Sequence, residues 1–166
     1  KSFGKVFPKK GANARIPYEH QKCAMENLDI MNKNAKYSTM IVLPTGGGKT
    51  LSSMRYALEL AKKEEKRHII YVAPFLSILE QNANEIRTIL NDDDNILEHH
   101  SNVCIDENNV EQLNRHELLA DDWSAPVIMT TTVQFLNTLF DGSMQSVRRL
   151  HQLTNAVIII DEAQSI

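Results

Sequence analysis

Three apolar runs rich in β-branched residues recur along the chain, and a helical pattern follows each of them. The runs are Thr39–Pro44 (TMIVLP), His68–Pro74 (HIIYVAP) and Ala156–Ile160 (AVIII), and a shorter one lies at Pro126–Thr130 (PVIMT). Such alternation is typical of βαβ units. Near-continuous apolar strands also fit a sheet that is covered on both faces. The sequence therefore predicts an α/β fold with a mostly parallel sheet and helices on both faces.

Apolar residues at helical spacing fill the segments between the predicted strands. Each stripe is best explained as packing against the sheet. The stripes comprise Leu51, Met54, Leu58 and Ala61; Leu76, Leu79, Ala83, Ile86 and Leu90; Val110, Leu113 and Leu118; and the segment from Val133 to Phe140.

The length of 166 residues and a hydrophobic content of 42% suit one globular domain. The net charge of −3 is uneven, because residues 91–125 hold ten acidic side chains against the single Arg115, which leaves +6 elsewhere. This acidic stretch is either a solvated face or a surface that keeps nucleic acid away. Cys23 and Cys104 show no metal-ligand spacing, and no apolar run approaches the roughly 20 residues of a membrane span. We therefore expect a soluble, cytoplasmic protein with no membrane partner.

A glycine cluster joins the first predicted strand to the first predicted helix, in the stretch LPTGGGKT (Leu43–Thr50). Gly46, Gly47 and Gly48 have no side chains, so the backbone can wrap a triphosphate and direct its N–H groups inward. The positive end of the following helix adds to the attraction. The cluster therefore predicts a phosphate-binding loop.

The two residues after the glycines complete this pattern. Lys49 is predicted to meet the β- and γ-phosphates of ATP, and the Thr50 hydroxyl to bind Mg²⁺. The alternative is a glycine-rich turn with an exposed lysine, which the flanking strand and helix disfavour. Leu43 is a departure, because it stands where the pattern has its first glycine.

An acidic pair follows the last apolar run, in the stretch AVIIIDEAQ (Ala156–Gln164). A carboxylate at the carboxyl end of a parallel strand points into the crevice where ligands of open α/β sheets bind. Asp161 is predicted to hold Mg²⁺ through water, and Glu162 to orient and deprotonate the attacking water. The alternative is an acidic pair that caps a helix, which the phosphate loop upstream disfavours.

The stretches PTGGGKT and DEAQ resemble motifs I and II of superfamily 2 helicases, whose second motif is usually DEAD or DEAH. Other stretches match in order: YEHQ resembles the glutamine motif, APFLSILEQ motif Ia, and TTTVQFL the next strand-binding motif. The resemblance covers nearly the whole chain. It implies a first RecA-like P-loop NTPase lobe over residues 1–166, with residues 1–38 as an N-terminal extension that carries the glutamine motif.

The resemblance also implies roles for individual residues. Gln21 would bond the adenine edge, and Tyr18 or Phe7 would stack on its ring. Contacts to nucleic acid would follow the phosphates without distinguishing bases, although a helix N-cap is an alternative role for each Ser or Thr. The implied sets are Gln21, Thr45, Gly46, Gly47, Gly48, Lys49 and Thr50 for ATP; Thr50 and Asp161 for Mg²⁺; Glu162 and Lys49 for catalysis; and Pro74, Ser77, Thr130, Thr131 and Gln134 for nucleic acid.

Five short stretches resemble one branch of this superfamily, the helicase part of the CRISPR-associated type I helicase-nuclease that Cascade recruits in antiviral defence. They are LPTGGGKT, PFLSILEQ, LEHHS, TTTVQF and DEAQS. The branch implies ATP-driven movement along single-stranded DNA in the 3′ to 5′ direction. It also implies three partners: a second helicase lobe with arginine fingers, an HD-type nuclease and a Cascade-type surveillance complex. None of the six histidines is followed by Asp, so we expect the nuclease, like the second lobe, outside these residues.

Two alternatives to a DNA motor remain open. One is a lobe of a DEAD-box-like RNA helicase, which Gln164 in the fourth position of motif II disfavours. The other is a nucleotide-binding scaffold lobe without motor activity, which Glu162 disfavours because a pure binder needs no general base. Without the second lobe, we expect weak binding of nucleotide and only a trace of hydrolysis.

Overall fold

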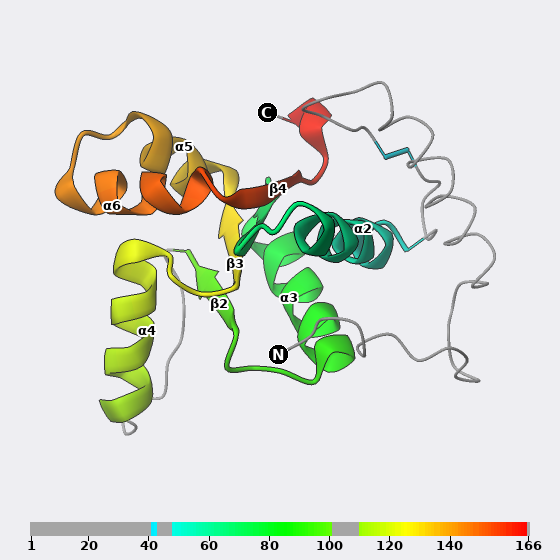
Figure 1. Ribbon diagram of the computed structural model, residues 1–166, viewed down its shortest axis with the longest axis horizontal. Coiled ribbons are helices and arrows are strands. Elements are labelled where there is room, and N and C mark those ends of the chain that lie inside the picture. Colours follow the sequence, from blue (N-terminus) through cyan, green and yellow to red (C-terminus); the bar gives the residue numbers. More distant parts are fainter. Residues whose placement is uncertain (1–40, 43–47, 101–109, 166) are drawn as a thin grey trace.

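Figure 1 shows the computed structural model, which describes residues 41–42, 48–100 and 110–165. A four-stranded sheet forms its centre, and every pair of neighbouring strands is parallel. The spatial order is β2-β3-β1-β4. The predicted α/β fold is therefore confirmed. The strands are β1 (His68–Ala73), β2 (Ile96–His99), β3 (Val127–Thr131) and β4 (Ala156–Ile160).

Helices connect the strands, as the apolar stripes predict. One prediction was incomplete, because the segment between β3 and β4 forms two helices. The second of these is mostly polar and is recognisable by its N-cap, where Ser143 accepts a hydrogen bond from the Ser146 N–H at 3.2 Å. In the part of the chain that the structure describes, no helix is both long and apolar enough to cross a bilayer. The helices are α2 (Lys49–Lys63), α3 (Leu76–Leu90), α4 (Val110–Asp122), α5 (Thr132–Phe140) and α6 (Met144–Leu153), and a 3-10 turn, η2, spans Ala163–Ser165.

Each face of the sheet builds its own core. Helices α2 and α3 cover one face, while α4, α5 and α6 lie on the other (Figure 1). Strand β1 supplies both cores, because Ile69 and Tyr71 point to the first face and Ile70 and Val72 to the second. Trp123 is the largest fully buried side chain of the second core. The fold is a three-layer α/β/α arrangement.

Two strands differ between the sequence prediction and the structure. The strand expected at Thr39–Pro44 lies mostly outside the described residues; of that range the structure describes Ile41 and Val42, which are assigned to no strand, and Val42 is largely exposed. Strand β2 was not predicted, because only Ile96 and Leu97 of its four residues are buried apolar side chains. So short a strand carries little apolar pattern.

Strand β4 also departs from the expectation of a sheet covered on both faces. Val157 and Ile159 pack against the core under α2 and α3. On the opposite face Ala156 packs into the second core, but Ile158 and Ile160 remain 40% and 45% exposed. Among the described strands β4 lies at the end of the order, whereas β1 lies in the interior and all of its residues are buried.

Candidate nucleotide-binding site

The first turn of α2 has the properties of an anion site. Its N-cap, Gly48, adopts a left-handed backbone with φ 69° and ψ 41°, a conformation that side-chain-free glycine adopts without strain. Among the described residues, no side chain caps the helix there. The first N–H groups of a helix have no partner within it, so they remain available to a phosphate, and the helix dipole favours the negative charge.

Lys49 and Glu162 bring the start of α2 together with the end of β4. The Lys49 Nζ donates to the Glu162 Oε1, and Gln164 donates to the other carboxylate oxygen. The hydrogen bond from Lys49, followed by that from Gln164, lowers the pKa of the Glu162 carboxyl. The same bond to Glu162 raises the pKa of Lys49. The pairing therefore favours the charged forms of both groups.

Asp161 directly follows β4, and hydrogen bonds of its backbone and of its side chain fix its position. Its backbone N–H donates to the Val72 carbonyl of β1 at 2.9 Å, which continues the ladder between the strands. Its Oδ1 accepts the Glu162 N–H at 2.9 Å. Glu162 itself has a positive φ of 47°, uncommon for a residue other than glycine, and it lies in the turn that follows β4.

Two buried side chains connect Asp161 to Thr50. The Tyr71 hydroxyl donates to the Asp161 Oδ2 at 2.8 Å, and the Asn82 amide donates to the same oxygen at 3.3 Å and to the Tyr71 hydroxyl at 3.0 Å. On its other side the Asn82 Oδ1 accepts the Thr50 hydroxyl at 3.0 Å. Burial, followed by the charge of Asp161, raises the pKa of Tyr71, which keeps this phenol protonated and able to donate.

The oxygens of Thr50 and Asp161 suit Mg²⁺. A hydroxyl and a carboxylate are hard ligands, and both bond the same Asn82 amide, which brings them to one place. Within residues 41–42, 48–100 and 110–165, no group of three or more His, Cys, Asp or Glu side chains could hold a metal alone. In phosphate sites Mg²⁺ takes one or two protein oxygens and completes its shell with phosphate and water. The pair therefore fits a Mg²⁺ ion that arrives with a nucleotide.

Tyr71 and Asn82 were not predicted from the sequence. Tyr71 lies within an apolar strand run, where its hydroxyl needs a partner once buried. Asn82 lies on the apolar face of α3, between the buried Leu79 and Ile86. A polar residue on a buried stripe is the signal that marks such a position, because a buried amide must find hydrogen-bond partners. Its partners could not be predicted from spacing.

Part of the predicted ATP site lies outside the described residues. Gln21, Thr45, Gly46 and Gly47 belong to this part, and so does the whole extension at residues 1–38. The described part of the predicted site is the set Gly48, Lys49, Thr50, Asp161 and Glu162. The structure brings these residues together at the carboxyl ends of β1 and β4, where ligands of open α/β sheets bind.

The predicted nucleic-acid residues follow β1 and β3 at the same edge of the sheet. Pro74 is half-buried, while Ser77 is exposed in the first turn of α3. Thr131 caps α5, since its hydroxyl accepts the Gln134 N–H at 3.4 Å. Thr130 is 0% exposed, and its hydroxyl donates to the His99 carbonyl at 2.9 Å. The Thr130 side chain therefore serves the sheet and does not face solvent.

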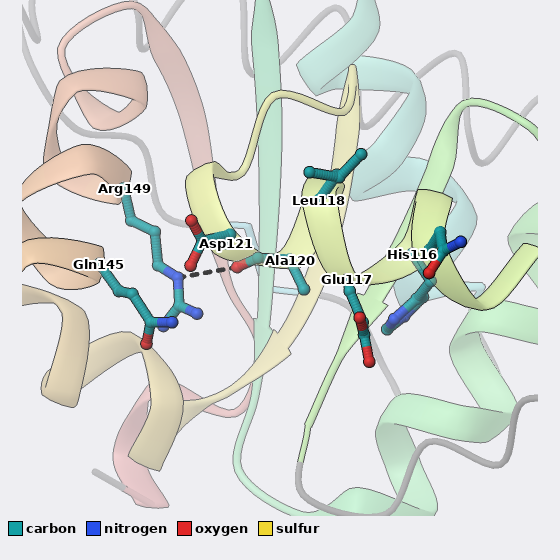
Figure 2. Close-up of a pocket in the computed structure, with 8 residues that line it drawn as sticks. His116, Glu117, Leu118, Ala120, Asp121, Gln145 and Arg149 are labelled. Carbon is teal, nitrogen blue, oxygen red and sulfur yellow. Dashed lines mark hydrogen bonds between the residues drawn. The ribbon is translucent and has the colours of Figure 1, made fainter.

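A separate pocket lies between α4 and α6, on the other face of the sheet (Figure 2). Arg149 lines this pocket and bonds its opposite wall. Its Nε donates to the Ala120 carbonyl at 2.9 Å, and its guanidinium lies 5.8 Å from the centre of the buried Trp123 ring. Burial lowers the pKa of this guanidinium. Arg148 pairs with Asp121 beside it at 2.5 Å. These contacts fasten α6 to α4, so we assign Arg148 and Arg149 a structural role.

Comparison with known protein families agrees with this geometry. Residues 15–164 match the family model of the type III restriction enzyme, res subunit. No curated protein matches the chain significantly. The matched residues span most of the chain and include α2, β4 and every side chain of the site described above. The chain thus belongs to the type III restriction enzyme res subunit family and is a RecA-like, ATP-binding lobe of a superfamily 2 helicase.

Proposed function

We propose that this lobe binds Mg·ATP between α2 and β4 and belongs to a motor that moves along single-stranded DNA. The observation that carries the proposal is the contact of Lys49 with Glu162 beside the linked Thr50 and Asp161. A phosphate ligand, a general base and two magnesium ligands are thereby gathered at one sheet edge.

The residues divide the work of ATP hydrolysis among them. Lys49 exchanges the Glu162 carboxylate for the β- and γ-phosphates, with help from the N–H groups at the start of α2. Glu162, freed of its lysine, orients the attacking water and accepts its proton. Mg²⁺ on Thr50 and, through water, on Asp161 would neutralise charge on the phosphates. An arginine finger from a second helicase lobe supplies the positive charge that stabilises the γ-phosphate in the transition state. This lobe alone therefore hydrolyses ATP at a trace rate.

Single-stranded DNA is the proposed track. Ser77 offers an exposed hydroxyl at the start of α3, which follows β1. Gln134 lies in the first turn of α5, which follows β3, a neighbour of β1 in the sheet. Contacts of this kind hold phosphates and do not distinguish bases. We leave the buried Thr130 out of the contacting surface.

The residue sequences of the motifs support a more specific role. LPTGGGKT, PFLSILEQ, LEHHS, TTTVQF and DEAQS together favour the helicase of type I CRISPR interference, a cytoplasmic antiviral system. In this proposal the lobe works with a second helicase lobe, an HD-type nuclease and a Cascade-type surveillance complex. The nuclease is either fused to the same chain or carried by a partner.

The test is the ATPase rate of the chain together with its second lobe, with single-stranded DNA, RNA or duplex DNA added at matched salt. We expect the strongest stimulation from single-stranded DNA, with an apparent affinity that falls as salt rises. Lys49→Ala should abolish the rate. Lys62→Ala, which removes an exposed lysine from the same helix, should not.

Each alternative has its own outcome in this assay. Stronger stimulation by RNA than by DNA would favour an RNA helicase of the DEAD-box type. Binding of Mg·ATP with no stimulated turnover would favour a scaffold lobe. Loss of CRISPR interference in cells that carry Lys49→Ala, but not in cells that carry Lys62→Ala, would support the specific role.

A further inference from the structure

The buried amide of Asn82 lies between the two predicted magnesium ligands. The residue is 5% exposed on α3, and every polar atom of its side chain has a partner. Its Oδ1 accepts from Thr50, and its Nδ2 donates to Tyr71 and to Asp161. Thr50 and Asp161 are far apart in the sequence, and one side chain from a third segment joins them.

The direction of these hydrogen bonds leaves a lone pair for a cation on the Thr50 hydroxyl and on the Asp161 carboxylate. The Thr50 hydroxyl uses its only hydrogen on Asn82, so its lone pairs remain available. The Asp161 Oδ2 accepts from Asn82 and Tyr71, and its Oδ1 accepts one backbone N–H. A carboxylate has about four acceptor positions, so one remains. Neither donor to Oδ2 carries a charge, so neither cancels the negative charge that draws a cation to the carboxylate.

We propose that Asn82 is the positioning residue of the magnesium site: it holds the Thr50 hydroxyl and the Asp161 carboxylate in place before the Mg²⁺ of the nucleotide arrives. The inference rests on the proposed function, because it assumes that Mg·nucleotide binds here. Side chains that orient metal ligands typically change metal affinity about 10- to 100-fold when they are removed.

An amide suits this task better than the other side chains of similar size. It accepts from Thr50 and donates to Asp161 at the same time, whereas a carboxylate cannot donate and would repel Asp161. Its position is also fixed, because the neighbouring Ala83 and the flanking Leu79 and Ile86 are buried in the core. A supporting side chain on a packed helix holds its ligands with little freedom.

Asn82→Leu tests the proposal, because leucine has a similar size but neither accepts nor donates. A fluorescent ADP analogue is bound to the chain while Mg²⁺ is titrated, below the unfolding temperature of both proteins. We expect the Mg²⁺ midpoint to rise about tenfold or more, with the affinity for the analogue in EDTA unchanged. Asn84→Leu, an exposed position on the same helix, should leave the midpoint within about twofold.

Three outcomes would overturn the proposal in distinguishable ways. A folded Asn82→Leu protein with an unchanged Mg²⁺ midpoint and a lower melting temperature would make Asn82 a purely structural residue. An equal loss of affinity with and without Mg²⁺ would make it a general support of the pocket. If the unaltered chain binds no analogue at all, the proposed function fails and the inference fails with it. Should Asn82→Leu not fold, Asn82→Ala is judged by the same criterion, with a smaller rise expected because water can occupy the vacated polar space.

Discussion

Two regions of the same sheet edge differ in how their polar side chains are held. In the phosphate corner, defined as Lys49, Thr50, Asp161 and Glu162 between α2 and β4, side chains bond one another or share a buried partner across long sequence separations. The strand-end region is defined as Pro74, Ser77, Thr131 and Gln134, at or just after the ends of β1 and β3. There the Thr131 hydroxyl accepts the Gln134 N–H, three residues along the chain, as a local helix cap. The corner is preorganised by tertiary contacts, whereas the strand-end region offers groups on the surface.

The difference explains why the two regions should respond differently to substitution. Each side chain of the corner has partners from other elements and one proposed role in ATP hydrolysis. A substitution there removes that single role. A change in the strand-end region removes one of several weak contacts to a ligand that touches many residues. Large, specific effects are expected in the first region, and small, additive ones in the second.

The largest expected effect is that of Glu162→Gln on turnover. In the chain joined to its second lobe, this change should slow ATP hydrolysis at least about a hundredfold and preserve ATP binding, because it removes the general base and keeps the shape. Steady-state turnover and nucleotide titration measure the two quantities. Glu59→Gln, an exposed glutamate on α2, is the control. A slowing of less than about tenfold would assign the base to another group.

A smaller effect is expected when Ser77→Ala and Gln134→Ala are combined. Each loses a solvent-accessible hydrogen bond to phosphate of about 0.7 to 1.4 kcal/mol, so together they should weaken single-stranded DNA binding by about tenfold to a hundredfold. Fluorescence anisotropy with a labelled oligonucleotide measures this affinity. Nucleotide binding should not change. The reverse result, with ATP affected and DNA not, would remove the distinction between the two regions.

Thr131→Ala should act on stability. Loss of the α5 cap lowers the free energy of unfolding by about 1 kcal/mol, whereas DNA affinity should change by less than about twofold. Ser143→Ala, which removes the cap of α6, should cost about the same and is the matched control. Denaturant unfolding gives both values. Weaker DNA binding for Thr131→Ala at unchanged stability would make this hydroxyl a DNA contact.

The smallest effect concerns the pH dependence of the Lys49–Glu162 pair. The pKa of Glu162 lies below its ordinary value of 4.5, so the pair adds stability that is present above about pH 4.5 and disappears as the pH falls through the lower value. The two side chains are partly exposed, so solvent weakens the contribution. Melting temperatures of the unaltered chain and of Glu162→Gln should differ slightly at pH 6 and converge in acid. A difference that grows in acid would contradict the pairing.

All four residues of the phosphate corner could be predicted from the sequence because their places follow rules of position. Lys49 and Thr50 begin a helix directly after the glycine cluster, and Asp161 and Glu162 follow a strand, so these locations are determined locally. Asn82 and Tyr71 could not be assigned their roles in this way, since their partners come from tertiary packing. Burial of Thr130 was missed for the same reason, since it depends on the packing around β3 and on the neighbouring His99 carbonyl. The partial exposure of Ile158 and Ile160 in β4 depends on how other elements pack around that strand, which apolar runs do not specify.

The central claim is that the start of α2 and the end of β4 form one site for Mg·nucleotide. The most direct test is calorimetric titration with a non-hydrolysable ATP analogue and Mg²⁺, performed on the unaltered chain and on Lys49→Ala. The account predicts weak but measurable binding to the unaltered chain and none to Lys49→Ala, because the lysine charge offsets phosphates that backbone dipoles alone do not hold. Lys62→Ala should bind as the unaltered chain does. Equal affinities for the unaltered chain and Lys49→Ala would place the nucleotide elsewhere and contradict the account.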